Sequence, residues 1–146
     1  MDEPGYTEAD IHVHATPQSF ERGLQYVHSG AVRRMVRRGD QVLARVEGGH
    51  YRPYKVRIRL KGAAIREARC DCPYEWGGWC KHIVAVLLAM LYQPERVKER
   101  AAIESLLDDL SPEQLRQLIL DLSDRYPRLI ARIERWVNSS RSADSA

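Results

Sequence analysis

The chain has 146 residues, of which 44% are hydrophobic and 29% are charged, and its formal net charge is +3. This length suits one domain with a helical extension. No run of about 18 apolar residues exists, so we expect no membrane-spanning helix. The acidic start of the chain lacks the pattern of a secretory signal, and we therefore expect a cytoplasmic protein.

An acidic lead and a short helix are predicted at the start of the chain. Residues 1–18 form the lead, and the first sixteen of them are expected to be loose. Behind it, Phe20, Leu24 and Val27 fall at helical spacing. Ser19 has the side chain of a good N-cap, so a helix is predicted to begin there.

The middle of the chain, residues 31–69, changes to a period of two. Val56 and Ile58 alternate with basic residues, as is typical of strands that have one buried and one solvated face. Turn signals such as Gly48-Gly49 separate the runs. The pattern predicts an antiparallel meander of three or four strands, although residues 32–38 also fit one face of a helix.

The last third of the chain is predicted to be helical. Residues 80–92 are apolar around most of a helix circumference, which indicates a buried helix. Three amphipathic helices are predicted at 94–109, 112–124 and 127–138. The serine-rich residues 139–146 are expected to be disordered.

All three cysteines of the chain lie within eleven residues, in the pattern Cys70-x-Cys72, seven residues, Cys80-x-His82. Zinc prefers a tetrahedron of thiolate and imidazole ligands. Because these four side chains fill that shell, the site should be structural and should have no open position for water. A chance cluster and a redox dithiol are the alternatives, but a redox pair usually has two residues between its cysteines.

The sequence around these residues resembles the SWIM zinc finger, which is found in bacterial helicase-like ATPases, plant transposases and small stand-alone bacterial proteins. The similarity is carried by residues 70–74 (CDCPY) and 78–85 (GWCKHIVA), and more loosely by 52–56 (RPYKV). The resemblance implies one structural zinc ion and, more weakly, binding of DNA or protein. The implied metal ligands are Cys70, Cys72, Cys80 and His82.

The predicted fold class is α+β. It consists of a short helix, an antiparallel three- to four-stranded meander, the zinc loop and buried helix, and a C-terminal helical region. We expect the acidic lead at 1–18, a SWIM-like zinc-binding domain at 19–92, the helical region at 93–138 and the tail at 139–146.

Basic charge is concentrated just before the cysteines. Residues 31–69 hold twelve Lys or Arg and three acids, which is an unusual balance for a surface that serves solubility alone. A basic sheet face binds phosphates of DNA or RNA without sequence preference; the alternative is an ordinary solvated face. The candidate nucleic-acid-binding residues are Arg33, Arg34, Arg37, Arg38, Arg45, Lys55, Arg57 and Arg59.

Two further features allow more than one interpretation. Trp76 and Trp79 flank the glycines of the zinc loop, where they would either stack on bases or, as we favour, shield the metal and anchor the loop. The amphipathic C-terminal helices would either pack among themselves or dock a protein partner. A protein-interaction adaptor for a helicase or recombination partner is therefore the alternative function.

Enzyme signatures are absent from the sequence. There is no phosphate-binding Gly-x-x-x-x-Gly-Lys-Ser/Thr loop, no Gly-x-Ser-x-Gly elbow and no His-Glu-x-x-His motif. We expect a binding module that is not an enzyme, with no small-molecule substrate.

Overall fold

The computed structural model describes residues 4–144, which form two compact units. Unit 1 is Met1–Ala102 and unit 2 is Ile103–Ala146. The start of the predicted acidic lead, residues 1–3, and the end of the predicted tail, residues 145–146, lie outside the described part. Among the described helices, none is long and apolar enough to cross a membrane.

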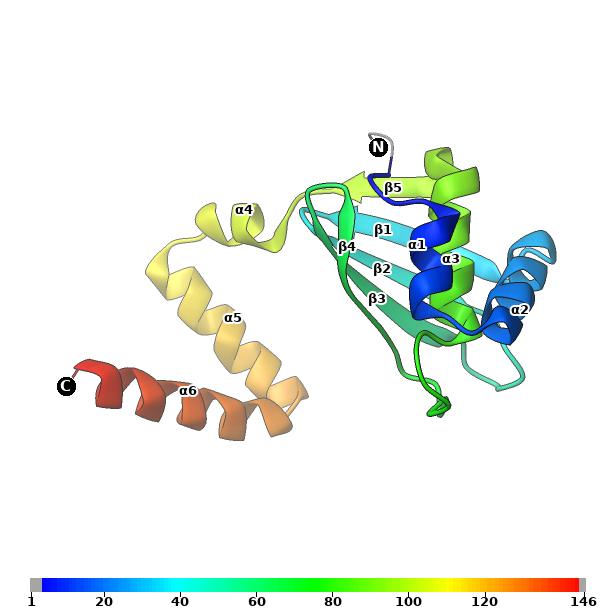
Figure 1. Cartoon of the computed structure of the whole chain (residues 1–146). Coiled ribbons are helices and arrows are strands. Elements are labelled where there is room, and N and C mark those ends of the chain that lie inside the picture. The colour runs from blue at the N-terminus through cyan, green and yellow to red at the C-terminus, as the bar shows by residue number, and fades with distance from the viewer. Residues whose placement is uncertain (1–3, 145–146) are drawn as a thin grey trace. The chain divides into compact units, whose positions relative to one another are not determined.

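Unit 1 opens with helix α1, Glu8–His14 (Figure 1). Thr7 and Asp10 form a capping box, in which each side chain binds the other residue's backbone N–H. Ile11 is fully buried and ties the helix to the core. The prediction that the first sixteen residues are loose is therefore wrong for this segment, because the capping box and the buried Ile11 stabilise a helix in a stretch of high polarity.

The predicted short helix is confirmed as α2, Pro17–His28. It begins earlier than predicted, because Thr16 is the N-cap and accepts a hydrogen bond from the backbone N–H of Ser19. Proline follows at the first helical position, where its missing N–H costs nothing.

A five-stranded sheet follows, with the strand order β4-β3-β2-β1-β5. The first four strands pair antiparallel in sequence order, which confirms the predicted meander, and residues 32–38 are a strand. The fifth strand adds to the edge of β1 in parallel. The strands are β1 Val32–Arg38, β2 Gln41–Val46, β3 Tyr54–Lys61, β4 Ala64–Cys70 and β5 Val97–Arg100.

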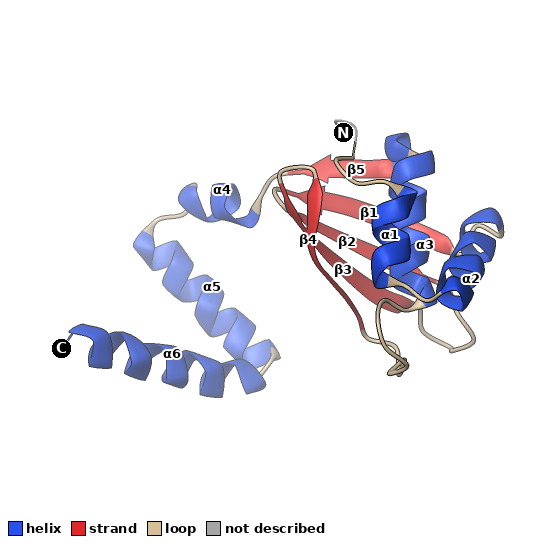
Figure 2. Ribbon diagram, in the orientation of Figure 1, coloured by secondary structure: helices blue, strands red, loops and turns tan. Residues whose placement is uncertain are grey.

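Helix α3, Lys81–Tyr92, is the centre of the core. Its residues from His82 to Met90 are all buried. Figure 2 shows α1, α2 and α3 on one face of the sheet, and α3 packs against both the strands and α2. The approach to α2 is close, because a Cβ on Gly23 would lie 2.5 Å from a methyl carbon of Val84.

The predicted helix at 94–109 is wrong. The structure has a 3-10 turn at Pro94–Arg96, strand β5, and then helix α4, Ile103–Asp108. Val97 is buried opposite Met35 of β1, so the sheet edge holds this segment extended in spite of its charged, helix-favouring composition.

Unit 2 consists of α4, α5 (Pro112–Arg125) and α6 (Arg128–Asp144). The two predicted helices are confirmed, and the predicted capping box of α5 is present between Ser111 and Gln114. Helix α6 continues past residue 139, the first residue of the predicted disordered tail. No described residue of these three helices is buried.

Candidate functional site

The predicted metal ligands come from the end of one strand and the start of one helix. Strand β4 ends at Cys70, and the loop 71–80 returns the chain to α3. Cys80 is the N-cap of that helix, and its sulfur accepts a hydrogen bond from the backbone N–H of Ile83 at 3.5 Å. The sheet edge and the helix start thus bring both halves of the motif to one place.

The four predicted ligands converge. One donor atom from each of Cys70, Cys72, Cys80 and His82 lies within 4.8 Å of all the others. Nδ1 of His82 lies 3.7 Å from the sulfur of Cys70 and 3.8 Å from that of Cys80. Tetrahedral zinc with ordinary bond lengths places sulfur and nitrogen ligands about 3.6 Å apart. The cluster therefore fits one structural zinc ion, with four protein ligands and no open position.

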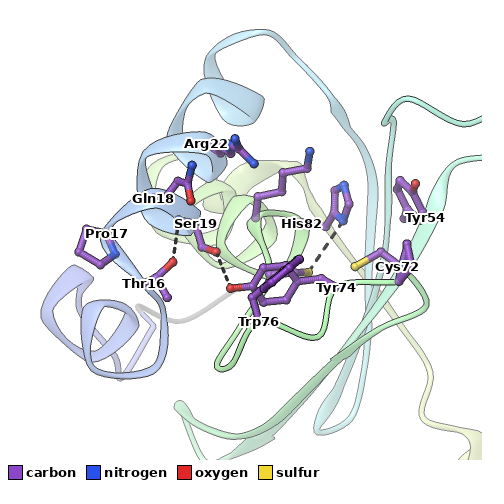
Figure 3. Close-up of a pocket in the computed structure, with 13 residues that line it drawn as sticks. Thr16, Pro17, Gln18, Ser19, Arg22, Tyr54, Cys72, Tyr74, Trp76 and His82 are labelled. Atoms are coloured by element: carbon purple, nitrogen blue, oxygen red, sulfur yellow. Dashed lines mark hydrogen bonds between the residues drawn. The ribbon is translucent and has the colours of Figure 1, made fainter.

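The imidazole of His82 is held by packing. Its Nε2 is buried and has no hydrogen-bond partner among the described residues, whereas Nδ1 faces the thiols. The ring of Tyr54 stacks on it with centroids 4.3 Å apart and planes inclined by 29° (Figure 3). Gly48 makes room for this stack, because a Cβ there would overlap the Tyr54 ring. The ring is thereby held with Nδ1 toward the three sulfurs.

The three thiols differ in acidity. The pKa of Cys80 is lowered to about 4, first by its hydrogen bond with Cys70 and also by those with His82 and Ile83. The same hydrogen bond raises the pKa of Cys70, and burial adds to that rise. Burial also raises the pKa of Cys72. Cys80 lies at the helix N-cap and accepts from the backbone N–H of Ile83, and backbone N–H groups at such a position favour a thiolate.

The residue between the first two ligands fixes the turn. The backbone N–H of Asp71 donates to the carbonyl of Lys55 at 3.2 Å. In return, the backbone N–H of Lys55 donates to Oδ1 of Asp71 at 2.9 Å. This reciprocal pair clamps the chain to β3 at the point where both thiols must face inward.

The far end of the loop is anchored to α1. Trp79 donates its backbone N–H to the carbonyl of His14 at 2.8 Å, and the two rings lie 4.5 Å apart. Gly78 has φ +71°, and a Cβ there would overlap the same carbonyl oxygen, so a side chain at this position would clash with backbone. Trp79 packs against the core, in agreement with the interpretation that it anchors the loop, whereas Trp76 is 86% exposed.

Most of the predicted nucleic-acid-binding residues share one surface. We call the sheet face opposite α3 the outer face; along each strand its residues alternate with the buried ones. Arg33 instead lies at a β-bulge and forms an ion pair with Glu47. Arg37 lies on the other side of the sheet, because it alternates along β1 with the outward residues. The outer face holds Arg34, Arg38, Arg45, Lys55, Arg57 and Arg59 of the predicted set.

The residues that support the ligands were not predicted from the sequence. Tyr54 and Gly48 are far from His82 in the sequence, and their contact with it depends on the folded chain. Asp71 stands between two ligands of the motif, and that position was the available signal. All three act on the orientation of ligands that the spacing had already identified.

Comparison with known proteins identifies the same region. Residues 54–91 match the family model of the SWIM zinc finger, from the first residue of β3 almost to the end of α3. No solved structure matches the chain. The matched segment contains the converging Cys3His cluster, the clamp at Asp71 and the buried helix. Residues 54–91 of this chain are accordingly a SWIM zinc finger.

Proposed function

We propose that this chain is a nucleic-acid-binding module in which one structural zinc ion braces the sheet and the outer face binds phosphates. It acts as a binding protein and not as an enzyme, because a zinc ion with four protein ligands has no position for substrate or water. We place it in the cytoplasm, where reducing conditions keep three thiols available for metal.

The observation that carries the proposal is the pairing of like charges across the strands. Arg34 lies directly opposite Arg45, which lies opposite Lys55 on the next strand. Arg57 lies opposite Arg69 in the same way. Like charges in these positions destabilise a sheet, and a polyanion bound on that surface would relieve their repulsion.

Little on the outer face neutralises these cations. Among the described strand residues, Glu67 is the only acidic residue on the outer face, and it forms an ion pair with Arg69. The side chains of Arg34, Arg45 and Arg57 make no hydrogen bond or ion pair with described residues. A shallow cavity of about 270 Å³ lies among Arg34, Arg38, Arg45 and Lys55, and it offers several cations to one phosphate at once.

The test is binding of a labelled 20-base-pair DNA duplex, measured by fluorescence anisotropy in 50 and 200 mM salt. If about six phosphates are neutralised, affinity should fall about 10³-fold between the two salt concentrations. The double substitution Arg45→Glu with Arg57→Glu should weaken binding at low salt by at least the same order. The matched control, Arg132→Glu with Arg135→Glu on α6, makes the same charge change in unit 2. Equal losses in the two variants, or no binding by the wild type, would refute the proposal.

A protein-interaction role is the second candidate, and the exposure of unit 2 favours it. Ile119 is 48% exposed, Ile130 51% and Trp136 72%. Helices of this amphipathic kind usually bury such residues. If unit 2 binds a partner through an apolar interface, Ile119→Asp should weaken that binding, and binding by the wild type should persist in 200 mM salt. A helicase or recombination protein recovered with the wild type, and lost in that variant alone, would support the adaptor role.

A further inference from the structure

A hollow of unit 1 lies beside the zinc site, on the side of the sheet that carries the helices. It has a volume of about 830 Å³, which is within the range of small-molecule and nucleotide sites. Figure 3 shows its walls: the first turns of α2, Tyr54 at the start of β3, and the zinc loop with Tyr74 and Trp76. It is separate from the outer face. Tyr54, which lines the hollow, alternates along β3 with the outward residues and therefore lies on the opposite side of the sheet.

The walls of this cavity are held in place by the metal site. Tyr54 stacks on the ligand His82. The hydroxyl of Tyr74 donates to the carbonyl of Gly77 at 3.1 Å and accepts from the hydroxyl of Ser19 at 3.3 Å. Cys72 and Cys80 also line the cavity. Its shape is therefore preformed wherever the zinc site is formed.

The charge of the lining is positive. Arg22 and Lys81 contribute two cations, and no Asp or Glu is among the lining residues. Lys81 lies over the ring of Tyr26 at 5.1 Å. Gln18 and Arg22 are one turn apart on α2, are exposed, and make no hydrogen bond or ion pair with described residues. The cavity is thus suited to an anionic ligand that also accepts hydrogen bonds.

Trp76 adds a flat apolar surface at the rim. Its side chain is 86% exposed although it belongs to a loop that is otherwise tied to α1 and α2. The other tryptophan of the loop, Trp79, packs against the core. An exposed indole beside two cations and two tyrosines is the combination that binds single-stranded nucleic acid, since every base has a face that stacks on an aromatic ring.

We propose that this cavity holds one unpaired nucleotide of a single-stranded nucleic acid, with its base on Trp76 and its phosphate near Arg22 and Lys81. The inference rests on the proposed function and adds a strand preference to it. Paired bases are stacked on their neighbours and cannot enter a cavity, whereas the outer face binds the backbone of either form. A single strand therefore gains a contact that a duplex lacks.

The test compares a labelled ten-residue oligothymidylate with a blunt duplex in anisotropy titrations at 100 mM salt. Trp76→Ala should weaken binding of the single strand about 10-fold and leave the duplex unchanged, because stacking on one aromatic ring is lost. Trp76→Phe should retain part of the affinity. Trp136→Ala is the matched control, since it removes a tryptophan that is 72% exposed on α6.

Two further measurements separate this inference from the proposed function. Arg45→Glu with Arg57→Glu should weaken single strand and duplex alike, whereas Arg22→Ala should weaken the single strand alone. If the outer-face variant behaves so but Trp76→Ala equals Trp136→Ala, the cavity inference is wrong and the proposed function stands. If the wild type binds neither probe, both are wrong. Equal zinc content in all variants confirms that the metal site is intact.

Discussion

The two units of this chain are both helical and amphipathic in part, but they differ in what they bury. All buried hydrophobic residues of the described chain belong to unit 1, where α3 lies between the sheet and two further helices. In unit 2, no described residue is buried. Helical stability in proteins comes mostly from packing of the apolar face. Unit 1 is therefore stabilised by its own core, whereas the helices of unit 2 depend more on local features such as the capping box of α5.

Loss of the metal should have the largest effect and should act on unit 1. Cys80→Ser removes one ligand but keeps a good N-cap for α3, so the effect isolates the metal. Because metal binding is coupled to folding, we expect a loss of more than about 5 kcal/mol in the free energy of unfolding. Thermal melting followed by circular dichroism, with zinc content of the same sample, measures it.

Chelation is the control for that variant. A strong chelator should bring the melting curve of the wild type to that of Cys80→Ser and should not change the variant further. A variant that melts like the wild type, or that keeps one tightly bound zinc, would contradict the role given to Cys80.

A core truncation is the second test, and it contrasts the units directly. Leu87→Ala removes a fully buried side chain of α3 and should cost about 2–5 kcal/mol. Leu118→Ala removes a leucine that is 37% exposed on α5 and should cost less than about 0.5 kcal/mol. Urea unfolding at equal protein concentration compares them. Similar losses in the two variants would mean that unit 2 has a core of its own or is covered in solution.

A close contact between two helices of unit 1 gives the smallest expected effect. Gly23→Ala places a Cβ against Val84 between α2 and α3, and overpacking of this kind costs about 1–2 kcal/mol. Gly49→Ala is the control, because nothing lies within 4 Å of a Cβ there. The difference between their urea midpoints measures the tolerance of the helix contact. A Gly23→Ala protein as stable as the control would show that α2 can move away from α3.

The sequence predicted most of the metal site and much of the sheet, because both depend on local patterns. The spacing of Cys70, Cys72, Cys80 and His82 identified the cluster that the structure brings together. The alternation in β3 fixed which residues face the core. What could not be predicted is the pairing of distant segments: β5 is extended because β1 offers a free edge, and nothing in its own charged residues indicates this.

The opposed cations of the outer face have a consequence for the free protein. Arg34, Arg45 and Lys55 repel one another in every molecule that folds the meander, and separate when it unfolds. Dissolved anions lessen that repulsion, so the folding equilibrium of unit 1 is linked to the anion concentration, as it would be to any ligand of the native state. Salt, which weakens most attractive surface contacts, should here favour the folded sheet.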